Sequence, residues 1–120
     1  EHLFEAALYV GRLSADVARR HSTTLGQNAT ATFILGGQVG EEPADILLVY
    51  PAGNYIRASD DRPFLQIGET KYGKAWLDLA LHSGADMITA AKVALSSMSA
   101  TATANLSVGP PYDLGIVQLR

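Results

Sequence analysis

The chain has 120 residues, 48% of them hydrophobic and 18% charged, and it carries a net charge of −3. This length and composition predict one globular domain and exclude a disordered chain. The acidic balance argues against nucleic acids and anionic membranes as partners, and the absence of cysteine excludes disulfides, thiolate catalysis and cysteine-based zinc sites.

The chain has no stretch that approaches the roughly 18 apolar residues of a membrane span. Its opening, EHLFEAALYV, lacks the basic region of a signal peptide, so we expect a cytoplasmic location. Because the first residue is Glu1 rather than Met, we also expect that the chain is processed, trimmed or incomplete at its start.

The first predicted element is an amphipathic helix over residues 3–20, with small and apolar side chains on one face and charged ones on the other. Asp16 and Arg20 are four residues apart, a spacing that allows an ion pair on the helix surface. The stretch that follows, HSTTLGQNAT, predicts a polar loop over residues 21–30.

A meander of about four antiparallel strands is predicted next. The apolar run ILLVY, residues 46–50, is the strongest signal for a buried strand. Turn residues at 51–54 and 60–63 separate it from later short strands. The four predicted strands are residues 30–39, 46–50, 55–59 and 64–67.

Two helices and a last strand complete the predicted order. The first helix covers residues 72–82 and ends at Gly84, which we expect in the left-handed conformation of a helix C-cap. The second helix begins after Asp86, a good N-cap residue. The predicted packing face of this helix consists of Ile88, Ala91, Leu95 and Met98. The last predicted strand covers residues 112–120. The order of elements predicts an α+β fold, with helices layered on an antiparallel sheet.

Most isolated polar residues have an ordinary structural explanation. The three histidines, at positions 2, 21 and 82, have no metal-ligand spacing, and surface or capping roles fit them best. The adjacent Asp60 and Asp61 fit a solvated turn better than an acid–base pair. Gly36 and Gly37 form no nucleotide-binding motif and predict a kink or bulge instead.

The junction IGETKYGK, residues 67–74, has two interpretations that the residues alone leave open. Thr70 would cap the following helix, with Gly73 three residues later. Alternatively, Gly68, Glu69 and Thr70 would line a site in which backbone N–H groups at the helix start bind an anion or oxyanion. Under the second interpretation, the residues alone predict a domain that binds a small ligand at residues 68–73.

A second polar turn, NLSVG, lies at residues 105–109, between the last helix and the last strand. Ser107 is neither in a GxSxG motif nor next to a histidine, which argues against a serine-hydrolase nucleophile. A turn role is therefore favoured. No complete catalytic constellation is present in the sequence.

Four segments together resemble Anbu, a bacterial proteasome-like family of the N-terminal-nucleophile hydrolase superfamily. They are ATFILGGQVG, LLVYPAGNYI, PFLQIGETKYGK and NLSVGPPYDL, and they occur in the family's order with compatible spacing. The similarity runs through essentially the whole chain, and IGETKYGK, NLSVG and FILGGQ are its most specific parts.

The resemblance implies a four-layer αββα sandwich of two antiparallel sheets between helix layers. Residues 1–120 would be a single partial domain, the C-terminal part of a subunit, with the N-terminal strands missing. The family's nucleophilic threonine and its aspartate and lysine partners lie on those early strands, so no catalytic residue is assigned in this chain. Half of a sandwich leaves an apolar sheet face uncovered, so we expect the isolated chain to be oligomeric, aggregated or completed by another chain.

The resemblance also implies which loops line the site. The matching residues are Gly68, Glu69 and Thr70 in one loop and Asn105 and Ser107 in the other. Proteasomes usually carry an Asp-x-x-Ser pattern in the second loop, and this chain departs from it, because Ala104 stands three residues before Ser107.

The function that the resemblance implies is threonine-type hydrolysis of peptide bonds, with peptides or proteins as substrates. The 120 residues alone are predicted to be inactive. The resemblance further implies a homo-oligomer, as a ring or open ring, and no cofactor or metal. The alternative is a non-catalytic assembly or binding subunit with the same fold.

Overall fold

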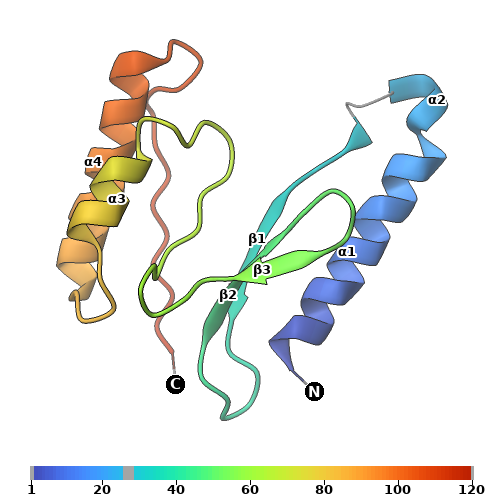
Figure 1. Ribbon diagram of the computed structural model, residues 1–120, viewed down its shortest axis with the longest axis horizontal. Helices are drawn as coiled ribbons and strands as arrows, with labels where there is room; N and C mark the ends of the chain where they lie inside the picture. The colour runs from blue at the N-terminus through green and yellow to red at the C-terminus, as the bar shows by residue number, and fades with distance from the viewer. Residues whose placement is uncertain (1, 26–28, 120) are drawn as a thin grey trace. The chain divides into compact units, whose positions relative to one another are not determined.

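The computed structural model describes residues 2–25 and 29–119, which form two compact units, Glu1–Ala58 and Ser59–Arg120. The elements of each unit are drawn in Figure 1. Helices and a small antiparallel sheet occur together, which confirms the predicted α+β class.

The first unit is built on helix α1 (Leu3–Arg20) and a three-stranded sheet. The strands are β1 (Phe33–Gly37), β2 (Asp45–Val49) and β3 (Tyr55–Arg57). Their order is β1-β2-β3 and both pairings are antiparallel, with Leu35 opposite Leu47 and Val49 opposite Tyr55. The central strand is the apolar run that the sequence marks as buried, although its bounds lie one residue earlier than predicted.

One face of this sheet packs on α1 and forms the core of the unit (Figure 1). Ala7, Leu47 and Val49 have no exposed surface. Val17, which the helical pattern places beside the buried face, is 43% exposed instead, because that face centres on Ala7 and Gly11. Leu3, Phe4, Val10, Leu35 and Tyr55 surround the core as partly buried side chains.

Gly11 brings α1 into backbone contact with the turn between β2 and β3. A Cβ atom at this position would lie 2.3 Å from the carbonyl oxygen of Gly53, a separation that real Cβ atoms do not show. Gly53 itself has a φ of +97°, which side chains rarely tolerate. The turn is held by the hydrogen bond from the Gly53 N–H to the Tyr50 carbonyl, 2.9 Å.

The second unit contains the helices α3 (Lys74–Ala80) and α4 (Met87–Ala104) and the loops around them. Asp86 caps α4 as predicted, because its carboxylate accepts a hydrogen bond from the Thr89 N–H at 2.7 Å. α3 is shorter than predicted, and Gly84 does not adopt the positive φ expected of a C-cap glycine.

The predicted packing face of α4 is wrong. Its buried residues are Val93, Ser97 and Thr101, whereas Ile88 is 68% exposed and Leu95 is 40% exposed. The small Ser97 and Thr101 side chains allow α3 to approach α4 closely, so the larger side chains turn outward. An amphipathic pattern alone does not show which side of a helix receives its partner.

Two predicted strands and one predicted loop also differ. Residues 64–67 and the described part of the last predicted strand, 112–119, have no strand partner among the described residues and are irregular. A β-strand needs a neighbouring backbone to pair with, so the meander has three strands rather than four. The predicted polar loop contains the short helix α2 (Ser22–Leu25), and residues 26–28 of that loop lie outside the described part.

The cap of α4 predicts a specific response to acid. Hydrogen bonds from the Thr89 side chain and N–H lower the pKa of Asp86 below its ordinary value of 3.8. A lowered pKa in the folded state means that this stabilisation is present above pH 3.8 and is lost as the pH falls through the lowered pKa. We expect Asp86→Ala to reduce the stability of the helix at neutral pH, and expect this difference from wild type to vanish in strong acid.

The measurement is helix content by circular dichroism during urea unfolding, repeated from about pH 7 to about pH 2, which spans the range in which this carboxyl group titrates. Asp86→Asn is the matched control, because asparagine caps helices well but carries no titrating group. An identical pH dependence in wild type and Asp86→Ala would contradict the assignment of the cap.

Candidate functional site

The loop that leads into α3 turns sharply at Gly68. Its φ is +83°, in the left-handed region that glycine adopts without strain. The next residue, Glu69, is exposed, and its Oε1 atom accepts a hydrogen bond from the Lys71 N–H at 3.3 Å. The turn at Gly68 and this local hydrogen bond therefore orient the Glu69 carboxylate.

Thr70 does not cap α3. The N-cap of this helix is Gly73, which has no side chain to accept a hydrogen bond, and a turn over residues 71–73 separates Thr70 from the helix. The Thr70 backbone carbonyl instead accepts the N–H of Lys74 at 3.1 Å. The capping interpretation of Thr70 is therefore wrong.

The second candidate loop begins where α4 ends, at Asn105. The Asn105 Nδ2 atom donates a hydrogen bond to Glu69 Oε2 at 3.1 Å, across 36 residues of sequence. The Oδ1 atom of the same side chain accepts two hydrogen bonds from Ser107, one from its N–H at 2.9 Å and one from its hydroxyl at 2.6 Å. The structure thus brings Glu69, Asn105 and Ser107 together in one hydrogen-bonded cluster.

Helices α3 and α4 hold the bases of these loops through a contact that the sequence patterns do not indicate. The Ser97 hydroxyl is buried and donates to the Gly73 carbonyl at 3.1 Å, and the Thr101 hydroxyl donates to the Ser97 carbonyl at 2.9 Å. A Cβ atom on Gly73 would lie 2.2 Å from Ser97 Oγ. The one sequence feature that could indicate this contact is the series of small residues in α4. Such residues give little hydrophobic periodicity.

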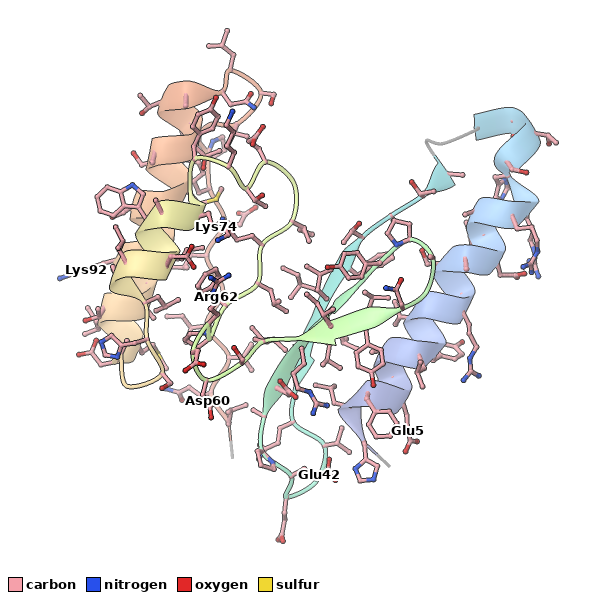
Figure 2. All side chains as sticks on the ribbon, viewed as in Figure 1. Glu5, Glu42, Asp60, Arg62, Lys74 and Lys92 are labelled. Atoms are coloured by element: carbon pink, nitrogen blue, oxygen red, sulfur yellow. The ribbon has the colours of Figure 1, made fainter. Side chains whose placement is uncertain are left out.

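An ion-pair cluster lies beside α3, where Figure 2 shows Arg62 and Lys74 near one another. Lys74 Nζ is 2.7 Å from Asp78 Oδ2, and Arg62 Nε is 4.0 Å from Asp78 Oδ1. The hydrogen bond from Lys74, with the charges of Lys74 and Arg62, lowers the pKa of Asp78 below 3.8. Asp78 is therefore a paired surface carboxylate, and its lowered pKa makes it a poor general base.

The other polar residues considered from the sequence show no catalytic geometry. Asp60 and Asp61 lie in a turn closed by hydrogen bonds between Ser59 and Arg62, as predicted. His2 pairs with Glu42 on the surface. Among the described residues, no group of histidine, aspartate and glutamate side chains is arranged to hold a metal ion.

One further hollow lies along α1, lined by residues of that helix alone, including Tyr9 and Leu13. Asp16 also lines it and forms the predicted ion pair with Arg20, with Arg20 Nη2 2.8 Å from Asp16 Oδ2. Across the described ranges, 2–25 and 29–119, no helix is both long enough and apolar enough to cross a membrane.

Comparison with solved structures gives strong similarity over nearly the whole chain. Anbu (ancestral beta-subunit) from Yersinia bercovieri is 39% identical, with a TM-score of 0.84 over 91% of this chain and 45% of that one. Anbu from Hyphomicrobium sp. strain MC1 is 40% identical, with a TM-score of 0.81 over 92% of this chain and 44% of that one.

A third similar structure is described as the helical assembly of the Anbu complex from Pseudomonas aeruginosa. It is 39% identical, with a TM-score of 0.83 over 90% of this chain and 46% of that chain. This chain therefore spans less than half the length of these relatives. No protein-family model matches the chain, and comparison with curated proteins gives no match.

Proposed function

Because this chain belongs to the Anbu family, we propose that it forms the C-terminal part of a proteasome-like subunit that hydrolyses peptide bonds. The nucleophile in this proposal is an N-terminal threonine on a strand outside these 120 residues. The chain itself supplies part of the wall of the active site. Its two compact units are parts of one domain.

The observation that carries this proposal is the direct link between the two candidate loops. The family resemblance assigns Gly68, Glu69 and Thr70 to one loop beside the nucleophile and Asn105 and Ser107 to the other. The hydrogen bond between Glu69 and Asn105 holds these loops side by side. A shared position beside one site explains why polar side chains from distant parts of the sequence converge there.

The four-layer sandwich is supported by the second face of the sheet. The residues that alternate with the core positions are also apolar, and they include Ile34 and Ile56, which are 40% and 45% exposed. An antiparallel sheet with one face in water normally carries polar side chains on that face. A second sheet stacked on the Ile34 face would bury it, as the sandwich requires.

The exposed side of α4 supports the same arrangement. Ile88, Leu95 and Met98 lie along one side of the helix and are at least 40% exposed. Surface stripes of large apolar side chains mark contact sites. In the proposed sandwich this stripe packs on a sheet supplied by the rest of the subunit.

We propose that the complete subunit forms a homo-oligomer. The relative from Pseudomonas aeruginosa is described as a helical assembly, which supports an oligomer built from repeated copies. Peptides or proteins are the proposed substrates, and the reaction needs no cofactor.

The proposal is tested by hydrolysis of fluorogenic peptides by two purified proteins, the 120-residue chain and the complete subunit. We expect turnover by the complete subunit and none by the chain alone, because the attacking threonine lies outside it. Replacing that threonine by alanine is the control and is expected to abolish turnover. No turnover by an assembled complete subunit with an intact N-terminal threonine would favour the non-catalytic assembly role instead.

A further inference from the structure

We infer that Asn105 is a positioning residue. Its carboxamide is polarised by the negative charge of Glu69 and orients the hydroxyl of Ser107. The inference rests on the proposed function, which makes these residues part of the site wall. Its physical basis is a chain of hydrogen bonds that runs from Glu69 through the Asn105 carboxamide to Ser107.

The orientation of the Asn105 carboxamide follows from its neighbours. A backbone N–H only donates, so the carbonyl oxygen of the carboxamide must face the Ser107 N–H, 2.9 Å away. The amide nitrogen therefore faces the Glu69 carboxylate, which only accepts when ionised. Both ends of the carboxamide have a complementary partner in this orientation alone.

The same reasoning places the hydrogen of the Ser107 hydroxyl. Its oxygen lies 2.6 Å from Asn105 Oδ1, which carries no hydrogen, so the hydroxyl must be the donor in this bond. The lone pairs of Ser107 Oγ are then left to accept a hydrogen bond from outside. A carboxamide oxygen is too weak a base to remove the proton, so Ser107 presents an acceptor and is not an activated nucleophile.

Glu69 strengthens this arrangement from the other side. The negative carboxylate makes its bond to the Asn105 amide charge-assisted, and successive hydrogen bonds polarise one another. The Lys71 N–H donates to the second carboxylate oxygen and so limits its rotation. Loss of Glu69 should therefore loosen Ser107, although the structure gives these two residues no direct hydrogen bond.

Amide exchange with solvent, measured by NMR on the complete subunit, tests this coupling. We expect Glu69→Ala to accelerate exchange of the Ser107 N–H by about fivefold, the effect of losing one ordinary hydrogen bond. The Arg62 and Thr89 amides are internal controls, because they also donate to side chains, of Ser59 and Asp86, but have no link to Glu69. Unchanged Ser107 exchange in Glu69→Ala would overturn the inference.

A charge-swapped pair of substitutions separates positioning from a general structural effect. Asn105→Asp places a second carboxylate against Glu69 and should open the link. Adding Glu69→Gln restores it, because the glutamine amide donates to the new carboxylate while its oxygen accepts the Lys71 N–H. In the complete subunit we expect Glu69→Ala and Asn105→Asp each to lower kcat by about tenfold with little change in KM.

The double variant Glu69→Gln/Asn105→Asp is expected to recover kcat to within about twofold of wild type, since the donor and acceptor have only exchanged places. A double variant no better than Asn105→Asp would overturn the positioning role. The exchange measurement needs no turnover. An inactive wild-type subunit with coupled Ser107 exchange would therefore refute the proposed hydrolysis and leave the inference supported.

Discussion

Replacing Gly11 by alanine is expected to destabilise the first unit by about 3 kcal/mol, the upper part of the usual range for overpacking. Its new Cβ atom would lie 2.3 Å from the Gly53 carbonyl oxygen and 3.0 Å from the Gly53 Cα. Both are backbone atoms of a tight turn, so neither can rotate away. The helix α1 must therefore separate from the turn, which exposes the core formed by Ala7, Leu47 and Val49.

The variant is expected to lose stability although helix propensity alone favours alanine over glycine by about 1 kcal/mol. The free energy of unfolding is measured in urea, with helicity as the signal. Gly115→Ala is the matched control, because nothing lies within 4 Å of a Cβ atom at that position and its φ is not positive. A Gly11→Ala variant as stable as wild type would show that α1 does not pack on the turn as described.

The second large effect is expected from Gly73→Ala, which should cost about 2 kcal/mol. The added Cβ atom would lie 2.2 Å from Ser97 Oγ, so the buried hydroxyl must leave its position. Its hydrogen bond to the Gly73 carbonyl is then broken. Because α3 follows the candidate site loop directly, we also expect chemical-shift changes at Glu69 and Asn105.

A double-mutant cycle tests the cause. Ser97→Ala alone removes the hydrogen bond and should cost about 1 kcal/mol. In Gly73→Ala/Ser97→Ala the clashing oxygen is absent, so the combined cost should be smaller than the sum of the two single costs. Strict additivity would mean that the two residues do not meet, and that another contact joins α3 to α4.

Parts of this fold are readable from the sequence because local physics determines them. The strand β2 consists of Asp45 and four consecutive apolar residues, and turn signals flank it. Asp86 caps α4 through the backbone N–H of Thr89, three residues away. Such features need no knowledge of distant segments. The α+β class follows from the order of these elements.

The incorrect predictions of strands and of a packing face depend on a distant partner. Residues 64–67 and 112–119 have strand-like sequences but no described strand to pair with. Large apolar side chains predict the wrong packing face of α4, because the contact with α3 uses Ser97 and the bare backbone of Gly73. Small residues contribute little to a hydrophobic pattern, so such a pattern does not predict close helix contacts of this kind.

The candidate site likewise combines local features that the sequence predicts with a long-range contact that it does not. Composition and spacing identify Glu69 and Ser107 only as polar residues in two turns. The family resemblance assigns both turns to one site, and the structure adds the carboxamide of Asn105 that joins them. A hydrogen bond across 36 residues has no periodic signature, so the sequence does not predict the link itself.

The central claim, that this chain lines a site whose nucleophile lies elsewhere in the subunit, is tested most directly by covalent labelling. An electrophilic peptide analogue that acylates N-terminal threonines is reacted with the complete subunit, and mass spectrometry of its fragments locates the adduct. We predict one adduct, on a threonine outside residues 1–120, and no labelling of the isolated chain. An adduct on Ser107, or on any other residue of this chain, would contradict the account.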